Sequence, residues 1–177
     1  MGYAMIRPAT ENDAAEIAAI YNHYVLNTAV SFEEEAVSVE EMGGRIREKM
    51  KSHPWIVYVS RGEILGYAYA GQWKERAAYR HTVEDTVYVK PGETGRGIGW
   101  QLLGCLLEAL AEDPEVHAIM AVIALPNDGS VRLHEDLGFG KAAHFSEVGF
   151  KFGRWIDVGY WELILGRRCE GRMLGRA

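Results

Sequence analysis

The stretch TVEDTVYVKPGETGRGIGW, residues 82–100, runs from a strand-like segment through a glycine-rich loop into the start of a helix. Thr82 to Lys90 is rich in β-branched residues, which is typical of a strand, and Trp100 to Ala111 is an apolar, helix-like run. The three glycines within residues 95–99 can adopt backbone angles closed to other residues, so successive N–H groups can converge on an anion beside a helix N-terminus. The sequence therefore predicts a phosphate-binding junction, to which Arg96 can add a charged donor. A tight turn that uses glycine for geometry alone is the alternative.

Two common anion-binding motifs do not match this loop. The dinucleotide-binding motif G-x-G-x-x-G requires glycine where this chain has Trp100. The P-loop requires Gly-Lys followed by Ser or Thr, and this triplet does not occur in the chain. The loop therefore predicts neither a dinucleotide-binding fold nor a P-loop nucleotidase.

Length and composition indicate one ordinary globular domain. The chain has 177 residues, of which 48% are hydrophobic and 25% charged, enough for a substantial core. We expect a single domain over residues 1–165 and a basic, disordered tail over residues 166–177. No apolar run approaches membrane-spanning length, and Met1 to Ile6 is too short for a secretory signal, so we expect a cytoplasmic protein without a membrane partner. The net charge of −6 argues against a nucleic-acid partner.

Cysteine usage points to neither a disulfide framework nor a metal site. The chain has two cysteines, Cys105 and Cys169, whose spacing matches no metal-binding motif. Cys105 falls on the apolar side of the expected helix, where an inert thiol is more common than a nucleophile. We therefore expect no bound metal and no covalent enzyme intermediate on cysteine.

Capping signals and hydrophobic periodicity predict the element order β-α-α-β-β-β-α-β-α-β-β. A weak capping pair, Thr10 and Asp13, precedes the first helix, and Ser38 and Glu41 form a capping box before the second. Gly138 is a good left-handed cap for the last helix. The expected helices span about 17–25, 39–50, 100–111 and 130–137, and the main strands 55–60, 64–70, 82–90, 118–124, 142–150 and 155–165. This order indicates an α/β fold with a mixed sheet and helices on its faces.

The motifs resemble the Gcn5-related N-acetyltransferase (GNAT) superfamily. Residues 94–99 are similar to its acetyl-CoA loop, Arg/Gln-x-x-Gly-x-Gly/Ala, with Thr94 in place of the usual Arg or Gln. A second superfamily element, Asn-x-x-Ser-x-x-x-Tyr-x-x-x-Gly-Phe, resembles residues 127–139, where His134 occupies the usual tyrosine position. Within the superfamily, the phosphinothricin and methionine sulfoximine N-acetyltransferases have segments similar to residues 68–79, 86–89, 125–128 and 149–158. The resemblance runs from about Ile6 to Leu165.

This resemblance implies the GNAT fold, an α/β fold with a mixed, mostly antiparallel central sheet and helices on both faces. The sheet is expected to splay between the strands that contain Val87 to Val89 and Ala121 to Ala124. The implied cosubstrate is acetyl-CoA, with no metal. The acetyl-CoA-binding residues that the resemblance implies are Val87, Tyr88, Val89, Thr94, Gly95, Arg96, Gly97, Ile98, Gly99, Asn127 and Ser130.

The implied activity is that of an acyltransferase of the EC 2.3.1 type. It would transfer acetyl to the amino group of phosphinothricin, methionine sulfoximine or a similar small amino acid, by direct attack in a ternary complex. The resemblance also implies a homodimer. Acetylation of a protein N-terminus or another amine is the alternative within the enzymes, and a non-catalytic acyl-CoA sensor is the alternative outside them.

Two titratable residues are candidates for proton transfer. Glu84 and Asp85 adjoin on a strand and so point to opposite faces. Glu84 matches the position that the phosphinothricin group uses as a general base, and partial desolvation could raise the pKa of such a carboxyl towards the working range. His134 titrates near neutrality and could accept the amine proton or donate to the departing thiolate. The sequence leaves open whether Glu84, His134 or both together act as the base.

A basic and aromatic cluster is the candidate substrate-binding segment. Lys74, Arg76 and Tyr79 lie between two expected strands of an acidic protein. The ammonium group of Lys74 and the guanidinium group of Arg76 could hold the carboxylate and phosphinate-like groups of a small amino acid. A solvated loop is the alternative. By analogy, the side chains expected to line the substrate side are Phe32, Trp155 and Val158, although core packing explains Trp155 equally well.

Overall fold

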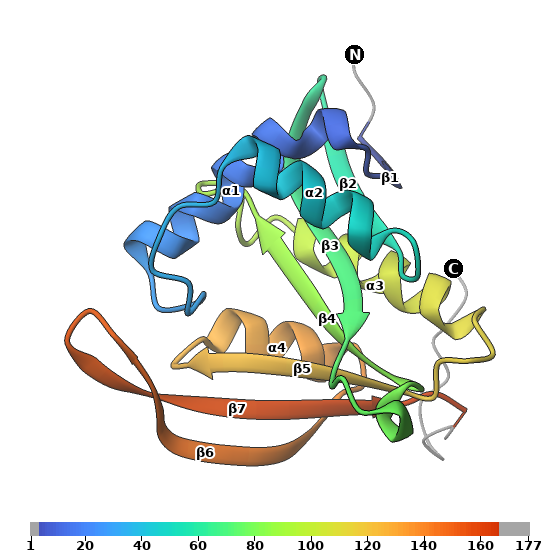
Figure 1. Cartoon of the computed structure of the whole chain (residues 1–177), viewed down its shortest axis with the longest axis vertical. Helices are drawn as coiled ribbons and strands as arrows, with labels where there is room; N and C mark the ends of the chain where they lie inside the picture. Colours follow the sequence, from blue (N-terminus) through green and yellow to red (C-terminus); the bar gives the residue numbers. More distant parts are fainter. Residues whose placement is uncertain (1–3, 167–177) are drawn as a thin grey trace.

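The computed structural model describes residues 4–166, in which the predicted element order is confirmed (Figure 1). The expected disordered tail lies, apart from Gly166, outside the described residues. The α-helices are α1 (Ala14–Asn27), α2 (Val39–Lys49), α3 (Ile98–Ala111) and α4 (Asp128–Asp136). The strands are β1 (Met5–Pro8), β2 (Trp55–Ser60), β3 (Glu63–Gln72), β4 (Thr82–Val89), β5 (Ala118–Leu125), β6 (Gly140–Lys151) and β7 (Arg154–Ile164). Two short 3-10 helices span Glu11–Asp13 and Ala77–Tyr79.

The local signals in the sequence act as predicted at the helix ends. The backbone N–H of Thr10 donates to Oδ2 of Asp13 at 2.7 Å. The side chain of Ser38 accepts from the N–H of Glu41 at 3.1 Å, which satisfies one of the free donors at the start of α2. Gly138 follows α4 with a φ of 96°, a conformation that costs a residue with a Cβ more than it costs glycine.

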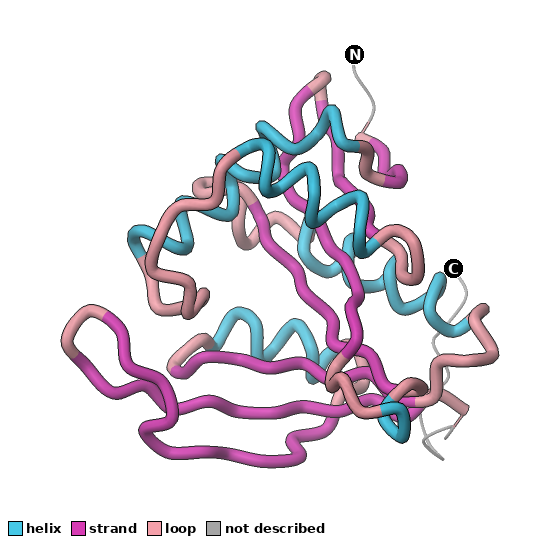
Figure 2. The backbone as a smooth tube through the Cα atoms, in the orientation of Figure 1, coloured by secondary structure: helices cyan, strands magenta, loops and turns pink. Residues whose placement is uncertain are grey.

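The strands form one sheet in the order β1-β2-β3-β4-β5-β7-β6. Only β4 and β5 pair in parallel, and the other neighbours are antiparallel. The β4–β5 pairing covers just Thr82–Glu84 against Ala118–Met120. Beyond it the strands diverge, leaving a first half-sheet (β1–β4) and a second half-sheet (β5–β7), which Figure 2 shows meeting at one end. The predicted mixed, splayed sheet is confirmed.

Two hydrophobic clusters fix the helices on opposite faces of the sheet. On one face α3 buries Leu102, Leu103 and Leu106 against Ala68 and neighbouring strand residues. On the other face α1 and α2 pack around Tyr67, which is fully buried. Each fully buried leucine contributes about 1.5–3 kcal/mol relative to an exposed one. Because Tyr67 and Ala68 are neighbours on β3, the period of two along the strand determines which face a side chain meets.

The β6–β7 hairpin, which turns at Phe152 and Gly153, exposes large apolar side chains instead of burying them. Trp155 is 61% exposed, so core packing does not explain it, and it is not among the residues that line the main cleft on the expected substrate side. It alternates with the buried Ile156 on β7 and faces outward. The other exposed apolar residues of the hairpin are Phe145, Val148, Phe150 and Phe152. Phe150 and Trp155 lie opposite each other in the β6–β7 register and form an exposed aromatic pair, which is typical of a surface that contacts another molecule.

Candidate active site

A cleft of about 760 Å³ opens where β4 and β5 diverge. Residues from both half-sheets, from α1, α3 and α4, and from the α1–α2 loop line it. The predicted acetyl-CoA-binding residues that line this cleft are Val87, Tyr88, Val89, Thr94, Gly95, Gly97, Ile98, Gly99, Asn127 and Ser130. Arg96 does not line the cleft. Its exposed side chain pairs instead with Glu93, which does line it.

The glycine loop at one end of the cleft has the backbone geometry that an anion site needs. Gly95 and Gly97 have φ angles of 76° and 77°, in the left-handed region that disfavours side chains. Gly97 is the N-cap of α3, so the first N–H groups of that helix have no intrahelical acceptor. These donors and the positive end of the helix dipole suit a pyrophosphate group.

Glu84 and Asp85 enter the cleft from opposite faces of the sheet. In the β3–β4 register Glu84 lies opposite Gly71, and Asp85 lies opposite Ala70 of the α3-side cluster. Glu84 therefore faces α2, where Nζ of Lys49 lies 5.0 Å from the centre of the Tyr69 ring. Burial raises the pKa of Glu84, and the nearby charge of Asp85 adds to this, whereas Lys49 and Lys74 oppose it.

On the opposite side of the cleft, Asp85 and His134 form a buried pair. Nε2 of His134 lies 3.0 Å from Oδ2 of Asp85, and Nδ1 lies 2.7 Å from the carbonyl oxygen of Ser130. Because a carbonyl and an ionised carboxylate only accept hydrogen bonds, this geometry places a proton on both ring nitrogens. Burial by itself lowers the pKa of His134, but the hydrogen bond and charge of Asp85, with the Ser130 carbonyl, outweigh it and raise the pKa. The arrangement favours an imidazolium.

The predicted substrate-binding residues do not all lie in the cleft. Phe32 lines it, as does Val158. The side chains of Lys74, Arg76 and Tyr79 are exposed in the β3–β4 connection and are not among the lining residues. There, Nζ of Lys74 lies 5.1 Å from the centre of the Trp73 ring, and Trp73 packs edge-on against Tyr79.

Several lining residues were not predicted as site residues. Tyr21 and Tyr24 of α1 line the cleft, and the hydroxyl of Tyr24 donates to the carbonyl oxygen of Val89 at 2.6 Å. Their helical spacing in the sequence indicates only that they share a helix face. Asp85 was recognised as the neighbour of Glu84, but nothing local pairs it with a histidine 49 positions away.

Within residues 4–166, no group of three or more His, Cys, Asp and Glu side chains is placed to hold a metal ion. None of the described helices is long and apolar enough to span a membrane.

Comparison with known families gives a match over most of the chain. The model of the acetyltransferase (GNAT) domain matches residues 6–159. The chain belongs to the GNAT acetyltransferase family. This GNAT chain is 41% identical to the phosphinothricin N-acetyltransferase of Streptomyces viridochromogenes over 157 residues, which is 89% of this chain and 85% of the relative.

Two further comparisons place the GNAT chain within this group. It is 37% identical to the L-methionine sulfoximine/L-methionine sulfone acetyltransferase of Salmonella typhimurium, over 90% of this chain and 94% of the relative. A Salmonella typhimurium acetyltransferase solved with its cofactor acetyl-CoA matches with a TM-score of 0.90 and 36% identity. That match covers 94% of this chain and 96% of the other.

Proposed function

We propose that this GNAT acetyltransferase transfers the acetyl group of acetyl-CoA to the amino group of phosphinothricin, methionine sulfoximine or a similar small amino acid. The observation that carries the proposal is the cleft between the half-sheets. A carboxylate enters it from one face and an Asp-His pair enters it from the other, beside a glycine-rich helix N-terminus. The names of the relatives that match most of the chain support the substrate class.

Acetyl-CoA would supply the thioester carbonyl that the amine attacks. The backbone of Gly95 to Gly99 and the start of α3 would hold its pyrophosphate, and Asn127 and Ser130 of the α4 cap would contact it from the β5 side. Backbone N–H groups of Val87 to Val89 are our candidates for binding the oxygen on which negative charge develops. Acetyl-CoA fits this site because the edge of β4 that faces β5 has no partner strand beyond Glu84.

In this proposal Glu84 accepts the proton of the substrate ammonium. Only a neutral amine can attack, so the base has to bind a proton near neutral pH. The raised pKa of Glu84 brings its carboxylate closer to that range. Its position on the α2 face, in a cleft that Phe32 and Tyr21 also line, puts the amine on the side away from His134.

His134 then donates the proton that the leaving thiolate needs. As the new N–C bond forms, the C–S bond breaks, the attacking nitrogen releases its second proton to solvent to become the amide, and the sulfur takes up a proton, so an acid is required on the cosubstrate side. The paired geometry with Asp85 and Ser130 keeps His134 protonated, which suits an acid better than a base. The hydroxyl of Ser130, 3.4 Å from Nδ1, can pass this proton on.

We further propose a homodimer that uses the exposed face of the β6–β7 hairpin. Phe150 and Trp155 stack edge to face at 4.9 Å between ring centres while more than half of each stays exposed. Burying two such rings in an interface is favourable because aromatic side chains carry large apolar areas. We also propose a cytoplasmic location, since the reaction consumes acetyl-CoA.

The deciding experiment measures thiol release from acetyl-CoA with a panel of amines. The panel contains phosphinothricin, methionine sulfoximine, methionine sulfone, common L-amino acids and a short peptide with a free N-terminus, and mass spectrometry identifies the product. We expect acetylated small amino acids with the acetyl group on the amino nitrogen. Much faster acetylation of the peptide would overturn the substrate class. Tight binding of acetyl-CoA with no product from any amine would favour a sensor over an enzyme.

A further inference from the structure

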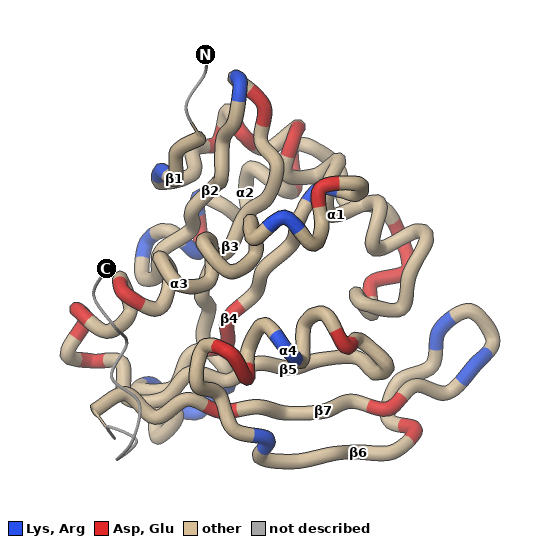
Figure 3. Tube along the Cα trace, turned by 180° about the vertical axis from the view of Figure 1, so that it is seen from behind, with Lys and Arg blue, Asp and Glu red and all other residues tan. Residues whose placement is uncertain are grey.

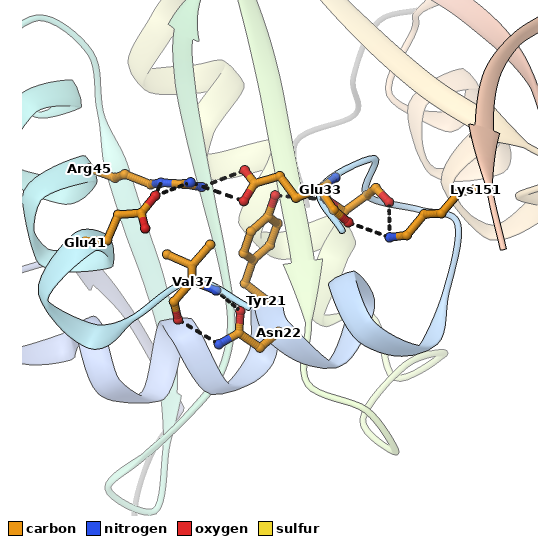
Figure 4. Close-up of polar contacts among 8 residues, drawn as sticks. Tyr21, Asn22, Glu33, Val37, Glu41, Arg45 and Lys151 are labelled. Atoms are coloured by element: carbon orange, nitrogen blue, oxygen red, sulfur yellow. Dashed lines mark hydrogen bonds and ion pairs between the residues drawn. The ribbon is translucent and has the colours of Figure 1, made fainter. Parts of the chain in front are cut away.

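Lys151, at the end of β6, is a buried cation whose three hydrogen bonds all go to backbone carbonyls. Only 2% of this residue is exposed. Its Nζ donates to the carbonyl oxygens of Val25 at 2.7 Å, Ser31 at 2.6 Å and Glu33 at 2.7 Å. Figure 4 shows the contact with Glu33. An ammonium group has three donors, so each has an acceptor here. Because an unpaired buried charge is costly, a lysine in this place indicates a specific use for its ammonium group.

The contact joins two parts of the fold that are far apart in the sequence. Val25 belongs to α1, and residues 28–38 form the α1–α2 loop. The two helices that this loop connects pack on the first half-sheet. Lys151 belongs to the second half-sheet, 118 to 126 positions further along the chain. In Figure 3 the acidic stretch of this loop faces the basic end of the β6–β7 hairpin. Since β4 and β5 pair only at Thr82–Glu84, Lys151 links the two half-sheets across the open end of the cleft.

The remaining polar contacts of the loop come from the helices of its own side. Arg45 of α2 donates to both carboxylate oxygens of Glu33, at 2.7 and 3.1 Å. The hydroxyl of Tyr21 lies 2.9 Å from that of Ser31, and the amide of Asn22 forms two hydrogen bonds with the backbone of Val37 (Figure 4). These contacts hold the loop on α1 and α2, but they do not set its distance from the second half-sheet. Among the hydrogen bonds of the described residues, those of Lys151 join the loop to the second half-sheet.

Phe32 lies between two of the carbonyls that Lys151 binds, those of Ser31 and Glu33. Its ring lines the cleft and rests on Gly149 of β6, where an added Cβ would overlap ring atoms of Phe32. The hairpin thus fixes Phe32 in two ways, through the ammonium group of Lys151 and through the bare backbone of Gly149.

We propose that Lys151 is a positioning residue that places Phe32 at the amine side of the cleft and thereby sets the affinity for the amine substrate. This inference rests on the proposed function, because it assigns the α2 face of the cleft to the amine. Lys151 does not act on acetyl-CoA, whose predicted site lies at the glycine loop. Loss of the Lys151 ammonium group should therefore weaken binding of the amine substrate and leave binding of acetyl-CoA unchanged.

Lys151→Met, which keeps the length of the side chain but has no donor, tests this proposal in the full chain. Lys141→Met is the matched control, because Lys141 is an exposed lysine on the same strand. Because the variant loses the hydrogen bonds that a charged group makes to this loop, we expect faster amide exchange in residues 28–38. We also expect the KM for the amine to rise by about tenfold or more, equivalent to about 1.4 kcal/mol. The Kd for acetyl-CoA should stay within about twofold, and Lys141→Met should resemble the parent in all three measurements.

Gly149→Ala provides a second test that leaves Lys151 in place. The added methyl displaces the Phe32 ring, so this variant should also raise the KM for the amine without weakening acetyl-CoA binding. It decides the question if Lys151→Met does not fold. Unchanged amide exchange in a folded Lys151→Met, or unchanged amine KM in Gly149→Ala, would overturn the proposal. If the parent chain acetylates no amine, the proposed function fails, while the exchange measurement still tests the link made by Lys151.

Discussion

At the scale of single residues, the proposed base, Glu84, and the proposed acid, His134, lie on opposite faces of the sheet. Asp85, which pairs with His134, is nevertheless the sequence neighbour of Glu84. We predict that Glu84→Gln lowers turnover by roughly 100-fold, because it removes basicity and keeps the shape. The Kd for acetyl-CoA, measured by calorimetry, should change little. Glu162→Gln is the matched control, since Glu162 is exposed on β7. A Glu84→Gln enzyme with near-parental turnover would remove Glu84 from the mechanism.

The pKa shifts of these residues give the pH profile a defined sign. The pKa of Glu84 is raised above its ordinary value, and a base acts when deprotonated, so turnover should fall as pH decreases through that raised pKa. The pKa of His134 is also raised, and an acid acts when protonated, so turnover should fall as pH increases through it. A bell-shaped profile is the expected result.

Asp85→Asn separates an acid from a base at His134. The variant keeps a hydrogen-bond acceptor but removes the negative charge that stabilises the imidazolium, so the pKa of His134 should fall. If His134 is the acid, the alkaline limb of the kcat profile moves to lower pH. If it is the base, the acidic limb moves instead. His134→Asn should abolish the limb that Asp85→Asn displaces, and a profile unchanged in both variants would exclude His134 from proton transfer.

At the scale of elements, the glycine loop and the start of α3 form one unit. Gly97→Val puts a β-branched residue at a φ of 77°, and its side chain would obstruct the approach of a pyrophosphate to the backbone. We predict a fold that stays largely intact and a Kd for acetyl-CoA raised by at least about tenfold, or about 1.4 kcal/mol. Gly92→Val is the control for backbone strain, because Gly92 has a φ of 85° but does not line the cleft. Equal cofactor affinity in both variants would remove the anion site from this loop.

Element boundaries were predictable wherever a local signal sets them, such as the Ser38 capping box or Gly138. The end of the cleft that we propose for acetyl-CoA was predictable for the same reason, because residues 94–99 and 127–130 are short, continuous motifs. The amine end was not, since α1, the α1–α2 loop and β6 assemble it from distant segments. A sequence shows that Lys74 and Arg76 are basic, but not that their side chains point away from the cleft. Likewise, nothing local shows that Lys151 is buried.

At the scale of the whole molecule, the exposed aromatic face of the hairpin should hold two copies together. We predict a dimer at micromolar concentration by light scattering, and dissociation to monomers in a Phe150→Ser, Trp155→Ser double variant, which removes both rings from the patch. Met5→Ser is a suitable control, because Met5 is exposed on β1 at the opposite edge of the sheet. A monomeric parent chain would refute the dimer.

The short pairing between β4 and β5 has a consequence for how long the protein survives. Each of these strands has a partner along one side only for much of its length, so the molecule contains two open edges in its interior, a hazard that proteins usually cover. A ligand seated between them binds the folded chain alone, and at 100 times its Kd it adds about 2.7 kcal/mol of stability. We expect acetyl-CoA to raise the melting temperature of the parent chain far more than that of Gly97→Val, as calorimetric scanning can measure. The lifetime of the enzyme would then follow the supply of the molecule that it consumes.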